Sequence, residues 1–188
     1  YKKKNDIYKY FDYILVGEGE TSVSMLMDFL VRNKGNYESI PNLLHVNDED
    51  GSVDVNEIIV EDVENLPVPD YSDLDLELYL APEIILPYQS SRGCHYGHCA
   101  FCNHDEKYRH HYRSKDMTKV VNELMFLSEK YNVRNFQFVD EAIRPDCFRK
   151  MVEEMDWHDD FKYINWFFYS RVSMQYDREL LEKAARNG

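Results

Sequence analysis

Basic residues and cysteines are scarce in this chain of 188 residues. It holds 22 Lys and Arg against 35 Asp and Glu, which gives a formal net charge of −13. A chain of this charge repels the phosphates of nucleic acids and of anionic lipids, so we expect neither a nucleic acid nor a membrane as its main partner. No apolar run approaches the roughly 18 residues of a membrane-spanning helix, and no signal-peptide pattern is present.

Only four cysteines occur, and three of them, Cys94, Cys99 and Cys102, lie within nine residues. A disulfide framework spreads its cysteines along the chain, so this cluster favours a reducing compartment, and we expect a cytoplasmic protein. Cys147 stands apart, and we interpret it as a half-buried thiol on a helix rather than a ligand. Three close thiols on one loop are typical of a zinc or iron–sulfur site.

Two metal centres suit this loop. A [4Fe–4S] cluster bound by three thiolates keeps one iron open to an outside ligand. Zinc would take a fourth protein ligand, for which His95, His98 and His104 lie close enough in the sequence. Two-cysteine zinc knuckles come as separated pairs, whereas this chain has a single C-x2-C pair, so the pattern favours iron–sulfur. A zinc-stabilised module and a non-catalytic corrinoid-binding or partner-binding module remain the alternatives.

Residues 1–36 have the pattern of one α/β unit. An apolar run over residues 10–16 suits a buried parallel strand. The turn Gly17-Glu18-Gly19-Glu20 follows, and it leads into a helix with Thr21 or Ser22 as its N-cap and Gly35 as its stop.

A hairpin and a linker come next. Strands are predicted over residues 43–46 and 57–60, joined by a polar turn over residues 47–52. Residues 61–83 are rich in proline and acids, so we expect an extended linker that contains the domain boundary.

After this linker, strand and helix patterns alternate three times. We predict strands over residues 84–89, 135–139 and 163–169, and helices that begin at Asp116, Pro145 and Asp177. This β-α-β-α-β-α order is typical of a parallel sheet or barrel. Each unit of an eight-unit barrel takes about 31 residues, so the segment suits three units and cannot close a barrel.

The cysteine loop resembles the cluster loop of radical S-adenosylmethionine (SAM) enzymes. Their signature is C-x3-C-x-aromatic-C, and the aromatic is present here as Phe101, although the first interval is one residue longer. Ser91-Arg92-Gly93 before the loop and Tyr96-Gly97 inside it are similar to the subgroup that carries an upstream cobalamin-binding domain. The Gly-Glu-Gly-Glu turn, the hairpin and the segment Leu66-Pro67-Val68-Pro69-Asp70-Tyr71 follow in the order typical of that subgroup.

The resemblance implies an α/β fold in three parts. Residues 1–36 would be the end of a Rossmann-like cobalamin-type domain, and residues 37–83 the hairpin and proline-containing linker. Residues 84–188 would be the first three units of a partial (β/α)6 radical SAM barrel. The remaining barrel strands would lie beyond Gly188, so we expect this chain, which starts at Tyr1, to be a fragment.

The resemblance also implies an activity. Cys94, Cys99 and Cys102 would hold a [4Fe–4S] cluster whose open iron binds SAM. Reductive cleavage of SAM would yield a 5′-deoxyadenosyl radical that abstracts hydrogen from an unreactive C–H bond, and cobalamin-dependent methylation is a further step open to the subgroup. The implied partners are a peptide or small-molecule substrate and an electron donor such as a flavodoxin or ferredoxin.

Further cofactor-binding residues are implied at the ends of the predicted strands. Phe101 would pack beside the adenine, or simply beneath the loop. Asp140 and Glu141 would accept hydrogen bonds from the SAM ammonium, and a solvated acidic turn is the alternative. Arg171, next to Tyr169 at the end of the third strand, would reach a carboxylate or phosphate, or form a surface ion pair.

Two other segments carry weaker signals. Gly17, Glu18 and Gly19 would let the backbone approach cobalamin, although a plain turn before a helix has the same sequence. Residues 107–115 are basic and aromatic, so they would face an anionic cofactor or substrate, or form a solvated loop.

Overall fold

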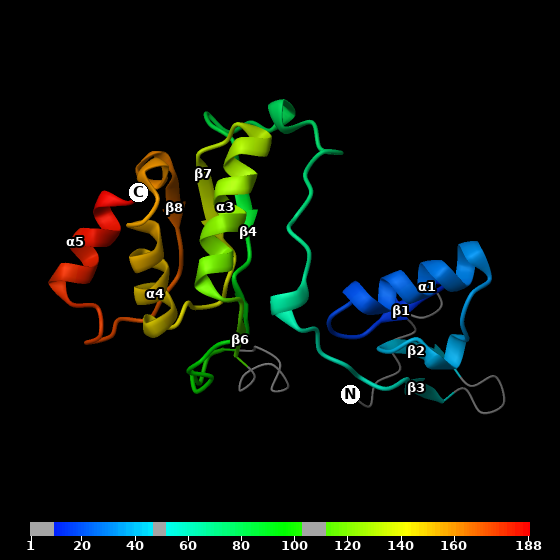
Figure 1. Ribbon diagram of the computed structural model, residues 1–188. Coiled ribbons are helices and arrows are strands. Elements are labelled where there is room, and N and C mark those ends of the chain that lie inside the picture. The colour runs from blue at the N-terminus through cyan, green and yellow to red at the C-terminus, as the bar shows by residue number, and fades with distance from the viewer. Residues whose placement is uncertain (1–9, 47–51, 103–111) are drawn as a thin grey trace. The chain divides into compact units, whose positions relative to one another are not determined.

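The computed structural model describes residues 10–46, 52–102 and 112–188 of the chain (Figure 1). The chain divides into two compact units, residues 1–62 (unit 1) and residues 63–188 (unit 2). Within the described residues, no helix has both the length and the apolar character needed to cross a membrane.

Unit 1 combines a three-stranded antiparallel sheet, in the order β1-β2-β3, with one α-helix. A small core of Leu26, Ile40 and Leu43 joins the helix to the sheet. The elements are β1 (Ile14–Leu15), α1 (Glu20–Arg32), the 3-10 turn η2 (Tyr37–Ser39), β2 (Leu43–Val46) and β3 (Val53–Val55).

The prediction of a buried parallel strand over residues 10–16 is wrong. Only Ile14 and Leu15 pair, and they run antiparallel to β2. Tyr10 and Phe11 are exposed, at 82% and 58%. An apolar run shows that a segment avoids water, but it does not specify the direction of the partner strand.

The prediction for the second half of the hairpin is also wrong. The strand is Val53–Val55 instead of residues 57–60, because residues 57–59 bond to the backbone and side chain of Asn42. Most of the predicted turn, residues 47–51, lies outside the described residues.

Unit 2 contains a parallel sheet in the order β4-β7-β8. The predicted β-α-β-α-β-α order is confirmed, with Ile85, Asn135 and Asn165 side by side at the amino ends of the strands. The strands are β4 (Ile85–Tyr88), β7 (Asn135–Phe138) and β8 (Asn165–Phe167), and the helices are α3 (Met117–Tyr131), α4 (Pro145–Met155) and α5 (Arg178–Arg186). The 3-10 turns are η3 (Val63–Asn65), η4 (Leu76–Leu78) and η5 (Asp159–Tyr163).

The helices of unit 2 begin where the sequence predicts. The Asp116 carboxylate accepts the Thr118 N–H at 2.9 Å, which satisfies a backbone donor at the start of α3. Asp177 accepts the Leu180 N–H at 2.9 Å in the same way. Pro145 starts α4, where its missing N–H costs no hydrogen bond.

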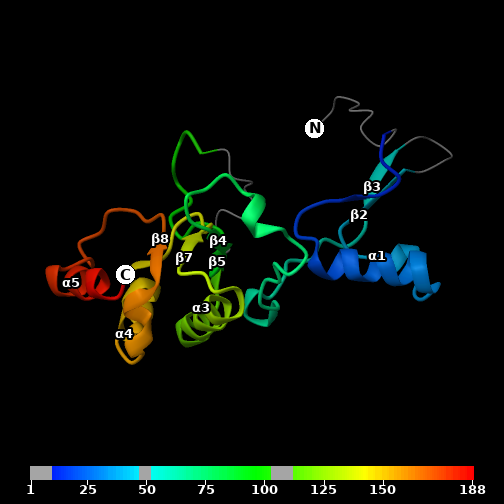
Figure 2. The same cartoon turned by 90° about the horizontal axis from the view of Figure 1, so that it is seen from above.

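One face of the parallel sheet is buried against helices. Leu86 and Tyr88 of β4 and Phe136 and Phe138 of β7 join a large core with the apolar stripes of α3 and α4. Figure 2 shows both helices on the same side of the sheet. Ile85 and Phe167, which alternate with these positions, are about half exposed on the opposite face.

The sequence did not predict a second, two-stranded sheet. β5 (Ser91–Arg92) pairs antiparallel with β6 (Arg113–Ser114). Because Arg92 lies opposite Arg113, the two ends of the segment over residues 93–112 meet at this pair of strands. This pair closes the base of the loop that carries the three cysteines.

Candidate cofactor-binding site

The cysteine loop begins at the carboxyl end of the parallel sheet. β4 ends at Tyr88, and the chain passes through β5 into the loop (Figure 1). In βα folds this end of the sheet is where binding and catalytic residues collect, because the loops after parallel strands meet there.

The three cysteines are half-buried, and they form no disulfide. The Cys102 N–H donates to the Cys99 carbonyl at 3.1 Å, so the last two cysteines flank one turn. Gly97, between the first two, has φ 62°, a conformation that other residues rarely adopt. Among the described residues, no three His, Cys, Asp or Glu side chains are gathered closely enough to hold a metal ion.

The chemistry of the loop fits an iron–sulfur cluster. Three thiols on one accessible loop are the usual protein ligands of such a cluster when one iron stays open. Beside Cys94, the Nδ1 atom of His95 is buried and has no hydrogen-bond partner in the described part of the chain. A buried polar atom without a partner is costly, so a group held by the neighbouring cysteine would relieve it.

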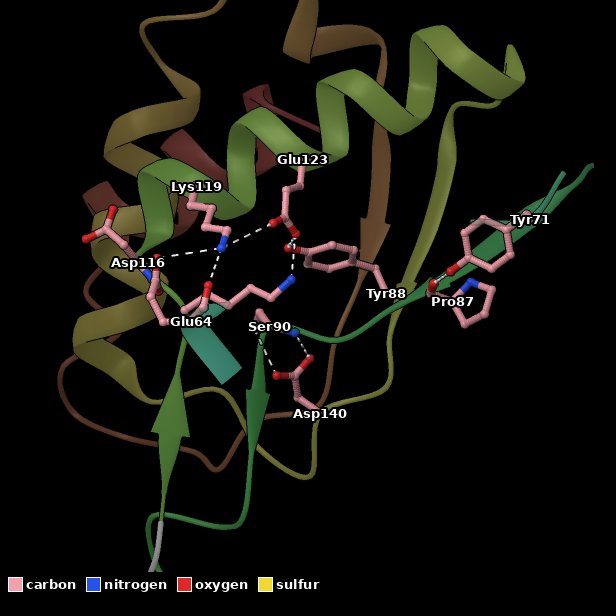
Figure 3. Close-up of polar contacts among 10 residues, drawn as sticks. Glu64, Tyr71, Pro87, Tyr88, Ser90, Asp116, Lys119, Glu123 and Asp140 are labelled. Atoms are coloured by element: carbon pink, nitrogen blue, oxygen red, sulfur yellow. Dashed lines mark hydrogen bonds and ion pairs between the residues drawn. The ribbon is translucent and has the colours of Figure 1, made fainter. Parts of the chain in front are cut away.

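Asp140 lies beneath the start of this loop. It follows β7 and is only 2% exposed. Its carboxylate accepts the Ser90 N–H at 3.2 Å, the Ser90 hydroxyl at 2.9 Å and the Ser91 hydroxyl at 2.5 Å. Figure 3 shows the carboxylate turned toward Ser90. Burial raises the pKa of Asp140, whereas the serine hydrogen bonds stabilise its charged form.

Glu141 contacts the same loop from a more exposed position. It is exposed, and its Oε2 accepts the Gly93 N–H at 3.1 Å. Gly93 has φ 83°, a left-handed backbone conformation that favours glycine. The structure thus brings both predicted carboxylates to the cysteine loop, and it gives them different surroundings.

Arg171 also reaches the loop. Its guanidinium lies over the ring of Tyr96, 3.4 Å from the ring centroid, which is a cation–π contact. The neighbouring Tyr169 accepts the Ile143 N–H through its backbone carbonyl at 3.1 Å. Phe101, at the tip of the loop, is 91% exposed.

Sequence reasoning missed the residues that support the loop from inside. Lys115 and Glu123 are both 5% exposed, and Lys115 Nζ lies 2.6 Å from Glu123 Oε2. The buried Tyr88 hydroxyl donates to the same oxygen at 2.6 Å (Figure 3), and burial together with this carboxylate raises the pKa of Tyr88. The Lys115 N–H donates to the Ser90 carbonyl at 2.9 Å, so this buried pair also holds the start of the loop.

Lys115 is the end of the predicted basic segment, and its ammonium pairs with the buried Glu123 carboxylate of the protein itself. Residues 107–111 of that segment lie outside the described residues. Tyr112 is packed edge-on against His95, with 5.9 Å between the ring centroids, and burial raises its pKa. Cys147 is half-buried on α4, as predicted, with its sulfur 3.7 Å from the Ser114 hydroxyl.

Comparison with known proteins finds similarity in sequence and in fold. Models of known protein families give no match to the chain. An uncharacterized methyltransferase from Pyrococcus horikoshii is 24% identical over 183 residues, which cover 94% of this chain and 38% of that protein. Two solved structures match with a TM-score of 0.70 and 18% identity. They are OxsB, a cobalamin-dependent SAM radical enzyme with aqua-cobalamin and SAM bound, and TsrM, a radical SAM methyltransferase from Kitasatospora setae with cobalamin and a [4Fe–4S] cluster bound.

The chain has the fold of part of a cobalamin-dependent radical SAM enzyme. The matches cover 96% of this chain and 27% of OxsB, and 97% of this chain and 38% of TsrM. The resemblance predicted from the sequence is thereby confirmed at the level of the fold. The chain spans less than two fifths of each of these proteins.

The predicted cobalamin-binding turn in unit 1 is held by internal hydrogen bonds. Asn42 is fully buried, and its Nδ2 donates to the Glu18 carbonyl at 2.5 Å. Its Oδ1 accepts the Ile59 N–H at 2.7 Å, and the Glu18 Oε2 accepts the Glu61 N–H at 2.6 Å. Gly17, at φ 94°, provides the sharp change of direction. The polar groups of Glu18 therefore stabilise unit 1 itself.

The helix that follows this turn begins differently from the prediction. Its N-cap is Gly19 rather than Thr21 or Ser22. The Glu61 carboxylate accepts the Thr21 N–H at 2.8 Å and the Thr21 hydroxyl at 2.9 Å, so a distant acid satisfies the helix terminus. The helix ends at Asn33 in the left-handed conformation, two residues before the predicted Gly35.

A pocket of about 470 Å³ lies on the open face of the parallel sheet. Its lining extends from Glu83, Asn135 and Asn165 at the amino ends of the strands to Gln137 and Phe167 farther along them. No described residue of the cysteine loop is part of this lining.

Proposed function

We propose that this chain is part of a radical SAM enzyme in which Cys94, Cys99 and Cys102 bind three irons of a [4Fe–4S] cluster. The observation that carries the proposal is the position of the three-thiol loop, which follows the first strand of a parallel sheet with a radical SAM fold. The presence of SAM in OxsB and of a [4Fe–4S] cluster in TsrM supports the same assignment.

When bound, the reduced cluster and SAM supply a radical by reductive cleavage of the SAM sulfonium bond. The residues of this chain would bind and orient these two cofactors and shield the radical from solvent. Glu141, exposed beside Gly93, is placed to accept hydrogen bonds from the SAM ammonium. The exposed ring of Phe101 is available to pack on the adenine. Arg171 contacts Tyr96 of the loop, and its guanidinium would reach a carboxylate or phosphate of the cofactor or substrate.

The reaction is functionalisation of a C–H bond in a peptide or small-molecule substrate, with electrons from a flavodoxin or ferredoxin. The methyltransferase relatives make methylation the leading reaction class. A reducing compartment, the cytoplasm, would keep the thiols available. The polar groups of Glu18 are hydrogen-bonded inside unit 1, so they would not be available to bind cobalamin.

A zinc site is the second candidate, because the buried Nδ1 of His95 has no hydrogen-bond partner in the described residues. With the three cysteines it would complete a Cys3His set. Such a site would be closed and structural, and it would supply no radical chemistry.

The deciding experiment is SAM cleavage by the full-length protein, reconstituted with iron and sulfide without oxygen. We expect 5′-deoxyadenosine to form when dithionite is added, and none to form without it. The Cys99→Ala variant, prepared in the same way, is the control and should produce none. A wild-type protein that binds zinc in place of iron and leaves SAM intact would favour the closed zinc site.

A further inference from the structure

We propose that Asp140 is the positioning residue of the cysteine loop: through Ser90 and Ser91 it fixes the point where the loop leaves the sheet, and it thereby controls how firmly the bound cluster is retained. This inference rests on the proposed function. The resemblance assigns the Asp140 carboxylate to SAM, whereas its contacts in the structure point to the protein's own loop.

The contacts of Asp140 are directed at one short segment. One oxygen accepts both serine hydroxyls, from Ser90 at 2.9 Å and from Ser91 at 2.5 Å. The other oxygen accepts the Ser90 N–H at 3.2 Å. These three hydrogen bonds connect the end of β7 to residues about fifty positions earlier, across the carboxyl edge of the sheet.

The segment that Asp140 holds is also the base of the loop. Ser91 pairs with Ser114 in the β5–β6 sheet, and the Ser90 carbonyl accepts the Lys115 N–H at 2.9 Å. Both ends of the loop therefore converge on these two serines. Cys94, the first proposed cluster ligand, follows only three residues after Ser91.

Burial makes this contact specific. Asp140 is 2% exposed, and both serines are also buried. A buried carboxylate is tolerated only when hydrogen bonds stabilise it, so the serines and the carboxylate depend on each other. The adjacent Glu141 is exposed and accepts the Gly93 N–H, so it lies on the solvent side of the same anchor.

The other contacts near the loop are poorer anchors. Arg171 and Tyr96 meet at the surface, where a cation–π contact contributes little. The buried Lys115–Glu123 pair fixes α3 against β4, and it touches the loop segment only through the Lys115 backbone. Asp140 alone, among these groups, accepts side-chain hydrogen bonds from both serines.

The test measures how fast iron leaves the reconstituted full-length protein in the presence of an excess of an iron chelator. In Asp140→Ala both serine hydroxyls lose their acceptor, and we expect iron release at least about tenfold faster than in wild type, the ratio expected for one hydrogen bond to a charged group. Asp140→Asn keeps one acceptor oxygen, so its rate of iron release should lie between those of wild type and Asp140→Ala. Asp73→Ala, an exposed acid elsewhere in unit 2, is the matched control and should release iron at the wild-type rate.

The electron paramagnetic resonance spectrum of the reduced cluster separates positioning from general loss of folding. A positioning role predicts altered g-values, or an altered response to SAM, in protein that is still loaded with iron. A purely structural role predicts less cluster with the wild-type spectrum, and that result would overturn the inference. Ser91→Ala removes one hydrogen bond and leaves the carboxylate in place, so it decides the question if Asp140→Ala fails to fold.

The outcomes also distinguish this inference from the proposed function. Wild-type protein that takes up no iron would contradict the proposed function, and the inference with it. Wild-type protein that holds a cluster, with iron release and spectra unchanged in Asp140→Ala and Ser91→Ala, would overturn the role of Asp140 alone.

Discussion

Each unit has a segment with glycines between a strand and a helix, and the two segments differ in how far their polar groups are hydrogen-bonded within the fold. In unit 1, the Gly17–Gly19 turn has its polar groups bonded to Asn42 and Glu61. In unit 2, the corresponding loop is anchored at its start by Asp140 and Glu141. The thiols beyond that anchor are half-exposed and form no disulfide.

This difference separates a structural turn from a binding loop. Where the polar groups of a segment are satisfied within the fold, a ligand must compete with existing hydrogen bonds. Where reactive groups extend from an anchored base, a ligand can bind without disrupting the fold. By this criterion we propose the cysteine loop as the binding site, whereas the polar groups of the Gly-Glu-Gly turn stabilise unit 1.

The largest expected effect is the loss of the metal centre. Replacing Cys94, Cys99 or Cys102 by Ala should reduce iron from about four per chain to well below one, because each thiolate holds one iron of the cluster. Cys147→Ala should keep the wild-type iron content, since that thiol lies on α4 outside the loop. Iron analysis after anaerobic reconstitution measures both. If all four cysteine variants held the same amount of iron, the cysteine loop would not be the metal-binding segment, and its contrast with the Gly17–Gly19 turn would fail.

A substitution that removes a hydrogen-bond partner of the Gly17–Gly19 turn should lower stability without affecting the metal centre. Asn42→Ala should destabilise unit 1 by about 3 kcal/mol, because it leaves the Glu18 carbonyl and the Ile59 N–H without partners and places Ala at a φ of 60°. Iron content should not change. Urea unfolding followed by hydrogen exchange in unit 1 measures the effect. Retained stability with lost iron would mean that the turn serves the cofactor.

Smaller losses of stability are expected at the starts of α1 and α3, the helices that follow the two segments. Glu61→Ala removes the acceptor at the start of α1, and Asp116→Ala removes the N-cap of α3. Each should lower stability by about 1 kcal/mol. Circular dichroism during urea unfolding of the apoprotein compares them with wild type. A loss in only one variant would show that the two helix termini are not equivalent.

The contribution of Asp116 should also depend on pH. Its hydrogen bond to Lys150, followed by the Thr118 contacts, lowers its pKa. A lowered folded-state pKa gives stability that is present above the unfolded value of about 3.9 and is lost as the pH falls through the folded value. The stability difference between wild type and Asp116→Ala should therefore be constant near neutral pH and shrink in acid. A difference that grew in acid would contradict this sign.

The smallest effect concerns the exposed part of the loop. Tyr96 and Arg171 are expected to couple by about 0.5–1 kcal/mol, the usual strength of an exposed cation–π contact. A double-mutant cycle with Tyr96→Leu and Arg171→Ala, measured by urea unfolding, gives the coupling. Strict additivity would show that the contact does not hold the loop in solution.

Local signals predicted much of unit 2. Apolar residues with helical spacing, preceded by Asp116 or Asp177 as caps, specify helices without tertiary information. The cysteine spacing likewise indicated a loop after the first strand of the parallel sheet, which is where the three cysteines lie. In unit 1, the run over residues 10–16 was misread, because strand direction depends on a partner strand that lies beyond the next helix.

The support of the site depends on long-range contacts that no local pattern encodes. Asp140 was predicted as a site residue, but its partners Ser90 and Ser91 lie about fifty positions away. The same applies to Glu61, whose role at the start of α1 depends on Thr21, forty positions earlier. Such contacts follow from the fold, and the sequence shows only that the residue types are suitable.

The central claim is that the cysteine loop binds an iron–sulfur cluster. Iron and acid-labile sulfide content, with an ultraviolet–visible spectrum, tests it most directly on the full-length protein after anaerobic reconstitution. The account predicts about four irons and four sulfides per chain, and broad visible absorption that bleaches with dithionite. A colourless protein with one zinc and no sulfide would contradict it.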